Sequence, residues 1–307
     1  MLDLSIVILT FNSENFIVRC LDSVIKWTGG VGYEIVVVDN ASIDRTVDTV
    51  KKFMKSVQFD TGLENFQLIE NKKNAGFAAG NNAGIKKARG RYVLLLNPDT
   101  ELVENSLKIM VSSIDRQPKV GIASCRLLNK NKSVQPTGGY FPTLPRIFLW
   151  SLFLDDLPFV QNIFGSYHPH TWGNFYLKDQ QLDWVTGAFF LIRREVIDEI
   201  GFLDEDFFLY VEELEYCMRA KRSGWRVGYV PTTGIIHFVG KSGTKEGTIL
   251  REMSGLLLLY RKHFPAWQAP LLRALLIFGS LARALVFGMI DNSRGKIYAK
   301  AFRQAFH

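Results

Sequence analysis

The 307-residue sequence has only three cysteines, Cys20, Cys125 and Cys217, at wide spacing and with no CxxC pair. This scarcity argues against a disulfide framework and against a zinc ribbon, and it fits a reducing compartment. The N-terminal run MLDLSIVILTFN lacks the basic segment and the small-residue cleavage site of a signal peptide, so we expect a buried strand there. Hydrophobic residues make up 47% of the chain and charged residues 22%, which indicates a globular protein with a large core.

Two common nucleotide-binding motifs are also missing. After the first apolar run the sequence reads TFNSEN, where a dinucleotide-binding fold needs G-x-G-x-x-G, and no Walker lysine loop is present. A nucleotide site in this chain therefore needs another phosphate anchor. A metal ion held by a carboxylate is the usual alternative.

The net charge of +7 is concentrated at one end of the chain. Residues 241–307 hold eleven Lys and Arg against three Asp and Glu, so this tail carries +8 and residues 1–240 carry −1. Apolar runs, LLLLY and LLRALLIFGSLARALVFGMI, lie among these basic residues. The combination favours contact with anionic lipid over nucleic acid, and we expect no nucleic-acid partner.

Strand-like and helix-like segments alternate along the first 125 residues. Continuous apolar runs predict strands over 4–9, 33–40, 66–71 and 91–97, with helices between them. This order predicts a parallel sheet, which binds ligands at the C-terminal ends of its strands. The predicted ends carry polar residues, in Thr10-Phe-Asn12, Asp39-Asn40 and Asn97-Pro-Asp99.

The middle of the chain differs from what precedes and follows it. Residues 126–183 are rich in aromatic residues and proline and have few periodic runs, so we expect an irregular insertion over the sheet edge. Regular structure is predicted to return with a strand over 185–194, a helix over 212–224 and a strand over 225–231. Beyond about residue 245 the pattern is helical.

Several polar residues admit both a structural and a chemical role. Asp99 follows an apolar strand and is either a metal ligand or the cap of a turn. Asp39 either binds a nucleotide or bonds its own turn. His237, in GIIHFVG, is by itself more typical of a core histidine.

An acidic segment is the candidate for general-base chemistry. Glu212, Glu213 and Glu215 open a predicted helix, where acids commonly complement the helix dipole. Asp204, Glu205 and Asp206 stand just upstream among aromatic residues, and carboxylates in partly apolar surroundings are candidate bases.

Four segments in order and at the usual spacing resemble the inverting family 2 glycosyltransferases of the GT-A fold, in their rhamnosyltransferase-like branch. They are SIVILTFNSENFIVRCLDSV, EIVVVDNASIDRT, NAGFAAGNNAGIKKARGRYVLLLNPDTEL and WVTGAFFLIRREVIDEIGFLDEDFFLYVEELEYCMRAKRSGWRVGYVP. The resemblance covers residues 4–240. It implies an α/β fold, a GT-A-type nucleotide-binding sheet flanked by helices, with a catalytic domain over 1–245 that includes the 126–183 insertion, and a helical tail over 246–307.

The resemblance also implies roles for individual residues. The positions matching the base and ribose site are Thr10, Asn12 and Asp39. Asn74 and Gly76 match the loop beside the nucleotide and its phosphates. Trp184, Gly187 and Ala188 match the segment that lines the sugar and acceptor subsites.

A metal site and a catalytic base follow from the same resemblance. Asn97 and Asp99 match the ends of the metal-binding D-x-D, and His237 matches a second ligand of Mg²⁺ or Mn²⁺. Glu213 matches the base, the second acid of an E-D-x-D cluster, with Glu212 before it and Arg219 following. Two departures stand out, because the metal motif keeps only one carboxylate and the base is Glu rather than Asp.

The activity that the resemblance implies is transfer of rhamnose or another hexose, with inversion, from a nucleoside-diphosphate donor. The acceptor would be a hydroxyl of a lipid-linked molecule or polysaccharide in cell-envelope glycan synthesis, at the cytoplasmic face of the membrane. One alternative is a sugar-nucleotide pyrophosphorylase, which needs a glycine-rich loop that TFNSEN does not supply. The other is a non-catalytic membrane scaffold that binds nucleotide sugars, against which the EELE cluster argues.

The tail is predicted to bind the membrane surface rather than to span it. Leu271–Ile290 is long enough to span, but Arg273 and Arg283 interrupt it, and ten residues of helix put them on roughly similar faces. The apolar residues left for the lipid are Leu275, Leu276, Phe278 and Leu285. Basic residues that would add attraction to an anionic leaflet are Arg294, Lys296, Lys300 and Arg303. The alternatives are that these helices pack on the catalytic domain or on a second copy of the chain in a homodimer.

Overall fold

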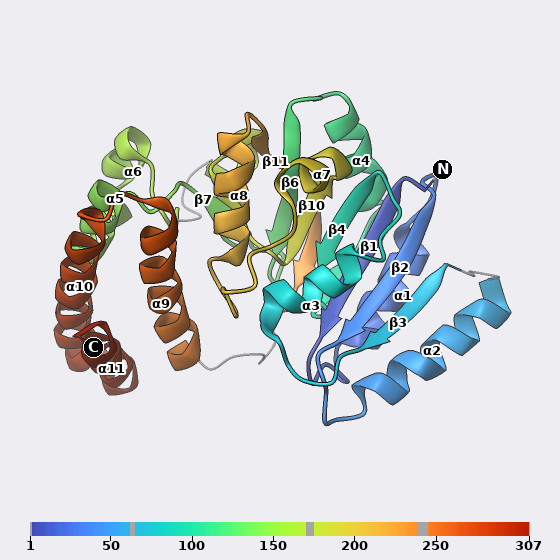
Figure 1. Ribbon diagram of the computed structural model, residues 1–307, viewed down its shortest axis with the longest axis horizontal. Helices are drawn as coiled ribbons and strands as arrows, with labels where there is room; N and C mark the ends of the chain where they lie inside the picture. The colour runs from blue at the N-terminus through green and yellow to red at the C-terminus, as the bar shows by residue number, and fades with distance from the viewer. Residues whose placement is uncertain (1, 62–64, 170–174, 239–244, 307) are drawn as a thin grey trace.

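The computed structural model describes residues 2–61, 65–169, 175–238 and 245–306. A central sheet is flanked by helices on both faces, and a separate group of helices stands beside it, with α8 between the two (Figure 1). The α/β fold expected from the sequence is confirmed.

Within the described residues the main sheet has nine strands, in the order β3-β2-β1-β4-β10-β6-β11-β5, with β8 paired to β11. Their bounds are β1 Leu4–Thr10, β2 Tyr33–Asp39, β3 Phe66–Glu70, β4 Tyr92–Leu96, β5 Thr100–Leu102, β6 Val120–Leu128, β8 Gln180–Leu182, β10 Phe189–Arg193 and β11 Arg226–His237. The first four in this order are parallel, as predicted. β10 is antiparallel to both β4 and β6, so the sheet as a whole is mixed. An apolar run identifies a buried strand but carries no information about its direction.

Helices cover both faces of the sheet because each buries an apolar stripe on it. One face packs against α1 (Ile17–Trp27), α2 (Thr46–Thr61) and α4 (Ser106–Asp115). The other packs against α3 (Gly76–Ile85), α7 (Arg194–Ile200) and α8 (Glu212–Arg222). All three cysteines are buried and free.

The aromatic-rich segment is more regular than expected. It contains β7 (Gly138–Gly139), α5 (Leu144–Ser151), η1 (Leu154–Asp156), α6 (Pro158–Phe164) and η2 (Phe175–Leu177). β7 pairs with β9 (Trp184–Val185) in a small second sheet.

Three C-terminal helices pack against this segment and against α8. They are α9 (Lys245–His263), α10 (Gln268–Ile290) and α11 (Asn292–Phe306). Leu272 and Leu276 of α10 join Leu256 of α9 and Leu214 of α8 in one buried cluster. One side of the tail therefore packs on the rest of the chain, as the first of the alternatives above expected.

The opposite side of α10 exposes apolar residues. Leu285 is 63% exposed and Met289 82%, and Leu271, Phe278 and Leu281 lie on the same exposed side. Among the described residues, Gln268–Met289 is the one helix whose length and apolar character would allow it to cross a membrane, which by itself is weak evidence.

The expectation that Arg273 and Arg283 share a face is wrong. Arg273 is exposed, whereas Arg283 is 5% exposed and stacks on the rings of Trp150 (4.0 Å) and Phe153 (4.5 Å). Its guanidinium also donates hydrogen bonds to the carbonyls of Trp150 and Ser151. Ten residues along an α-helix place the two side chains about 80° apart around the helix axis. On a half-buried helix, this angle is enough to expose one residue and bury the other.

Candidate active site

The ends of β1 and β2 hold a buried carboxylate. Asp39 accepts hydrogen bonds from the Thr10 hydroxyl (2.9 Å), the Ser42 amide (2.8 Å) and the Ser42 hydroxyl (2.6 Å). Asn12, at φ +51°, accepts a bond from the Ile43 amide (2.9 Å). The structure thus brings the predicted residues Thr10, Asn12 and Asp39 together. The bonds of Asp39 to Ser42 are those of the turn alternative, and its contact with a nucleotide stays a prediction.

Asn40, which sequence reasoning did not select, ties this edge to the loop before α3. Its side-chain amide donates to the Gly76 carbonyl (2.9 Å) and to Asn74 Oδ1 (3.3 Å). Gly76 has φ +89°, and a Cβ there would lie 2.4 Å from the Phe208 carbonyl oxygen. Only glycine fits such a position, so Gly76 lets the loop touch the segment that carries the acids.

The predicted pair Gly187 and Ala188 lies between the strand ends and this loop. The Ala188 carbonyl accepts a hydrogen bond from the Asn97 amide (3.1 Å). A Cβ on Gly187 would lie 2.8 Å from the ring of Phe77, the residue after Gly76. These contacts gather Asn74, Gly76, Asn97, Gly187 and Ala188 in one region.

The predicted metal ligands are neighbours. Antiparallel pairing of β11 with β5 places His237 opposite Thr100, next to Asp99. His237 Nε2 lies 3.4 Å from Asp99 Oδ1, and both side chains are largely buried. Two ligand atoms at right angles on a Mg²⁺ ion lie about 3 Å apart, so this pair fits two positions on one cation.

Gln135 fixes the ring of His237. The Gln135 side-chain nitrogen donates to Asn129 Oδ1 (2.9 Å) and to the His237 carbonyl (2.7 Å), so its oxygen faces His237 Nδ1 at 2.9 Å. Nδ1 must then carry the proton, which leaves the lone pair of Nε2 directed toward Asp99. This is the tautomer of a metal ligand with an outer hydrogen-bond partner. No sequence pattern marks Gln135.

Two protein ligands leave most of a coordination sphere open. Within the described parts of the chain no group of three or more His, Cys, Asp and Glu side chains could hold a metal ion. The residues therefore fit a cation that takes its other ligands from a bound diphosphate and water.

The acidic helix α8 begins on a strained turn. Tyr210 (φ +70°) and Val211 (φ +75°) are consecutive non-glycine residues in the left-handed region, which is rare for a β-branched side chain. Such strain concentrates at functional sites. Glu212 and Glu213 follow at once, and each has one buried carboxylate oxygen with no hydrogen-bond partner among the described residues.

Burial raises the pKa of both carboxyl groups. For Glu213, burial raises the pKa most, and the nearby charge of Glu252 raises it further. Hydrogen bonds from backbone amides, including that of Gly187, lower the pKa of Glu213. Burial and the neighbouring Glu213 hold the pKa of Glu212, which is 2% exposed, well above its usual range. Glu213, which receives the Gly187 amide and lies near His168, is the better candidate for an ionised base.

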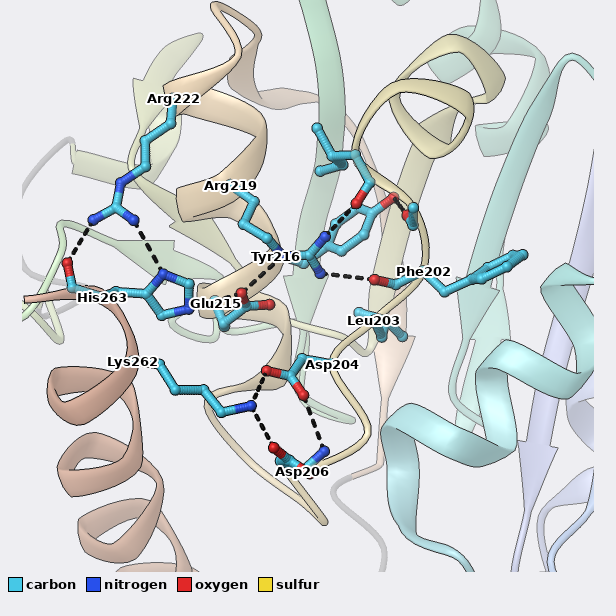
Figure 2. Close-up of polar contacts among 12 residues, drawn as sticks. Phe202, Leu203, Asp204, Asp206, Glu215, Tyr216, Arg219, Arg222, Lys262 and His263 are labelled. Atoms are coloured by element: carbon cyan, nitrogen blue, oxygen red, sulfur yellow. Dashed lines mark hydrogen bonds and ion pairs between the residues drawn. The ribbon is translucent and has the colours of Figure 1, made fainter.

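Arg219 holds protein groups with all three guanidinium nitrogens. Nε donates to Glu215 (2.7 Å) and Nη2 to the Phe202 carbonyl (2.7 Å), as Figure 2 shows. Nη1 donates to the Ile200 carbonyl (2.6 Å). This arrangement gives Arg219 a structural role, and its substrate contact stays a prediction.

The upstream acids also have partners. Asp204 and Asp206 both bind the ammonium group of Lys262, at the end of α9 (Figure 2). Because these carboxylates are already paired, the structure favours Glu213 over Asp204 and Asp206 as the base.

Trp184 lies against two aromatic side chains of the segment that precedes it. Its indole Nε1 is buried with no partner in the described chain. Its ring centre lies 5.9 Å from that of Tyr167 and 5.7 Å from that of His168. Both of these residues escaped sequence reasoning because they lie in the segment expected to be irregular.

Comparison with known proteins identifies the family. Residues 5–201 match the model named Glycosyl transferase family 2. The chain belongs to glycosyl transferase family 2. The match includes the predicted positions from Thr10 to Ala188, whereas Glu212, Glu213, Arg219 and His237 lie beyond it.

Curated family 2 relatives include enzymes of glycan synthesis. The chain is 28% identical over 244 residues to the low-salt glycan biosynthesis hexosyltransferase Agl10 of Haloferax volcanii, covering 76% of this chain and 67% of that protein. It is 23% identical over 190 residues to an N-acetylglucosaminyl-diphospho-decaprenol L-rhamnosyltransferase of Mycobacterium tuberculosis, covering 59% of this chain and 58% of that protein.

Solved structures support the GT-A fold of this family 2 chain. A mannosyltransferase from Pyrobaculum calidifontis, PcManGT in complex with GDP-Man and Mn²⁺, superposes with a TM-score of 0.59 at 16% identity, over 98% of this chain and 85% of that one. GalNAc-T7 with UDP, GalNAc and Mn²⁺ superposes with a TM-score of 0.63 at 17% identity, over 99% of this chain and 56% of that one.

Proposed function

We propose that this chain is an inverting glycosyltransferase that moves rhamnose or another hexose from a nucleoside-diphosphate donor to an acceptor hydroxyl. The observation that carries the proposal is the position of Gly187 and Ala188. The Ala188 carbonyl binds the amide of Asn97, two residues from Asp99, and the Gly187 amide reaches the carboxylate of Glu213. One dipeptide thus joins a candidate diphosphate anchor to a candidate base, the two groups that such a transfer needs.

The reaction follows from these groups. Glu213 takes the proton of the acceptor hydroxyl as its oxygen attacks the anomeric carbon from the face opposite the diphosphate. The bond between that carbon and the diphosphate oxygen breaks as the new bond forms, so the anomeric centre inverts without a covalent intermediate. Asp99 and His237 would hold Mg²⁺ or Mn²⁺, which supplies positive charge beside the departing diphosphate when bound.

The donor would lie along the ends of β1, β2 and β4. Thr10, Asn12 and Asp39 would contact the base and ribose, and Asn74 and Gly76 the nucleotide and its phosphates. Asn97, Trp184, Gly187 and Ala188 would then line the sugar. The relatives named for hexosyl and L-rhamnosyl transfer support these sugars.

The acceptor is proposed to be a lipid-linked molecule or polysaccharide of cell-envelope glycan synthesis. The mycobacterial relative, named for a lipid-diphosphate substrate, supports the first choice. The exposed apolar side of α10 supports peripheral attachment of the tail, residues 246–307, to the cytoplasmic face of the membrane. Residues 1–245 would form the catalytic domain.

A donor screen tests the proposal. dTDP-rhamnose, UDP-hexoses and GDP-sugars are screened by thermal shift with and without Mn²⁺, and each binder is then assayed for hydrolysis and for transfer. The acceptor panel contains octyl N-acetylglucosaminide and a short-chain prenyl diphosphate carrying N-acetylglucosamine. Metal-dependent binding with hydrolysis or transfer is expected. Formation of a nucleotide sugar from a sugar phosphate and a nucleoside triphosphate would indicate a pyrophosphorylase, and binding without turnover would indicate a scaffold.

A further inference from the structure

Helix α9 lies along the segment that presents the acids. Its Thr248 hydroxyl lies 2.9 Å from the Tyr210 hydroxyl, and a Cβ on Gly255 would lie 2.7 Å from the side chain of Val211. These residues are spaced by two helical turns, so they belong to one face of α9. The glycine lets the helix approach the strained turn on which Glu212 and Glu213 follow.

The far end of the same helix continues this contact. Lys262 binds Asp204 at 2.6 Å, and His263 Nε2 lies 3.0 Å from Glu215 Oε1 (Figure 2). Helix α9 is therefore fixed to the acidic segment at both ends. The α9 residues between Thr248 and Lys262 are held beside that segment.

Glu252 lies between them and joins α9 to the aromatic segment. Its Oε1 accepts a hydrogen bond from the Tyr167 hydroxyl (2.9 Å) and lies 2.6 Å from His168 Nε2. Within the described residues no hydrogen bond reaches its other oxygen. The side chain is 22% exposed and that of His168 is 39% exposed, so a ligand can reach this pair.

The pair faces the base and the indole of Trp184. Glu252 and His168 both act on the charge of Glu213, the first raising and the second lowering its pKa, so the three groups are close. Glu213 and Trp184 contribute a buried acceptor and a buried donor that no described residue satisfies. Buried polar groups are normally paired, and a hydroxyl, which both donates and accepts, can satisfy an acceptor or a donor of this kind.

We propose that Glu252 and His168 bind a hydroxyl of the acceptor sugar, so that helix α9 forms the acceptor wall of the active site. The proposal rests on the proposed function, in which Glu213 removes the acceptor proton. The donor elements are the strand ends of residues 10–99, and no hydrogen bond in the described chain joins Tyr167, His168 or Glu252 to them. The rings of Trp184 and Tyr167 add the apolar surface against which a sugar ring can lie.

The test separates acceptor binding from donor chemistry. Glu252→Gln and His168→Gln are compared with wild type for donor binding, donor hydrolysis and the KM of the acceptor panel named above. The matched control is Glu246→Gln, the same change on α9 at an exposed pair with Lys300. Both site variants should raise the acceptor KM about tenfold or more, while donor affinity changes less than about twofold. The control should behave as wild type.

Tyr167→Phe guards against a folding defect, because it removes only the hydroxyl that holds Glu252. It should melt close to wild type and still raise the acceptor KM. Unchanged acceptor KM in all three site variants would overturn the inference, as would a wild-type protein that hydrolyses a donor but binds no member of the acceptor panel. A wild-type protein that neither binds nor hydrolyses any donor would overturn the proposed function instead.

Discussion

His237 and Asp99 are far apart in the sequence, yet Nε2 of the histidine lies 3.4 Å from Oδ1 of the aspartate. The pairing of β11 with β5 brings the two side chains together. Gln135 fixes the histidine tautomer that leaves Nε2 free to bind a metal ion. The arrangement explains how a metal motif with a single carboxylate, Asn97-Pro98-Asp99, could still hold a cation.

Metal binding should depend on the nucleotide. In calorimetry, Mg²⁺ or Mn²⁺ should bind the protein weakly and bind more tightly in the presence of a nucleoside diphosphate, because Asp99 and His237 fill only part of the coordination sphere. Asp99→Asn should abolish the tightening. Full activity in excess EDTA would contradict the assignment.

Gln135→Leu should weaken metal binding about tenfold, the lower end of the usual effect of losing an outer hydrogen-bond partner. The change frees the His237 ring to adopt the other tautomer. Gln117→Leu, the same substitution at an exposed position, is the control. Equal metal affinity in the two variants would argue against a role for Gln135.

Glu213→Gln should keep donor binding and lower turnover about 10²-fold or more, the usual scale for a missing general base. Glu212→Gln should lower turnover much less, because burial and the neighbouring Glu213 raise the pKa of Glu212 and so disfavour the ionised form that a base needs. In wild type, the acid limb of the kcat/KM profile should lie above 4.5, since the pKa of Glu213 is raised from that value. The opposite order of the two variants would move the base to Glu212.

Glu212→Gln should also stabilise the protein at high pH. The folded-state pKa of Glu212 is raised above 4.5, so as pH rises past this value the unfolded chain loses its proton first and stability falls. Glutamine removes this loss. The melting temperature of the variant should match wild type near pH 4 and exceed it at pH 8, by about 2–4 °C for each kcal/mol recovered. Equal melting temperatures at pH 8 would show that the folded-state pKa of Glu212 is not raised.

Much of the fold could be predicted from the sequence because it depends on local patterns. Continuous apolar runs identified β1, β2, β3 and β4, and their parallel order placed Thr10, Asp39 and Asn97 at one edge. The antiparallel direction of β10 could not be predicted, because strand direction is set by chain connections rather than by composition.

The acceptor side could not be predicted for a related reason. Glu252 is an ordinary polar position in an amphipathic helix, and its meeting with His168 depends on how two distant segments pack. The contact of Gln135 with His237 likewise depends on the packing of distant segments and could not be predicted from the sequence. The arginines of α10 were misjudged because sequence spacing gives an angle but not which side of the helix is buried.

The last prediction concerns the membrane. Truncation after Pro265 would remove Leu272 and Leu276 from the cluster they share with α9, so point changes on the exposed side of α10 are the sharper test. Leu285→Asp with Met289→Asp should reduce sedimentation with anionic liposomes at low salt by about tenfold or more, since burying each side chain contributes about 1.5–3 kcal/mol. Donor binding should not change, because these residues lie on α10, away from the sheet (Figure 1). Val18→Asp with Trp27→Asp, on the exposed side of α1, is the matched control. Salt should weaken binding, because basic residues near the surface each add about 1 kcal/mol of screened attraction. If the full-length protein ignores liposomes at low salt, or resists extraction by high salt and carbonate, the helix does not act as an interfacial anchor.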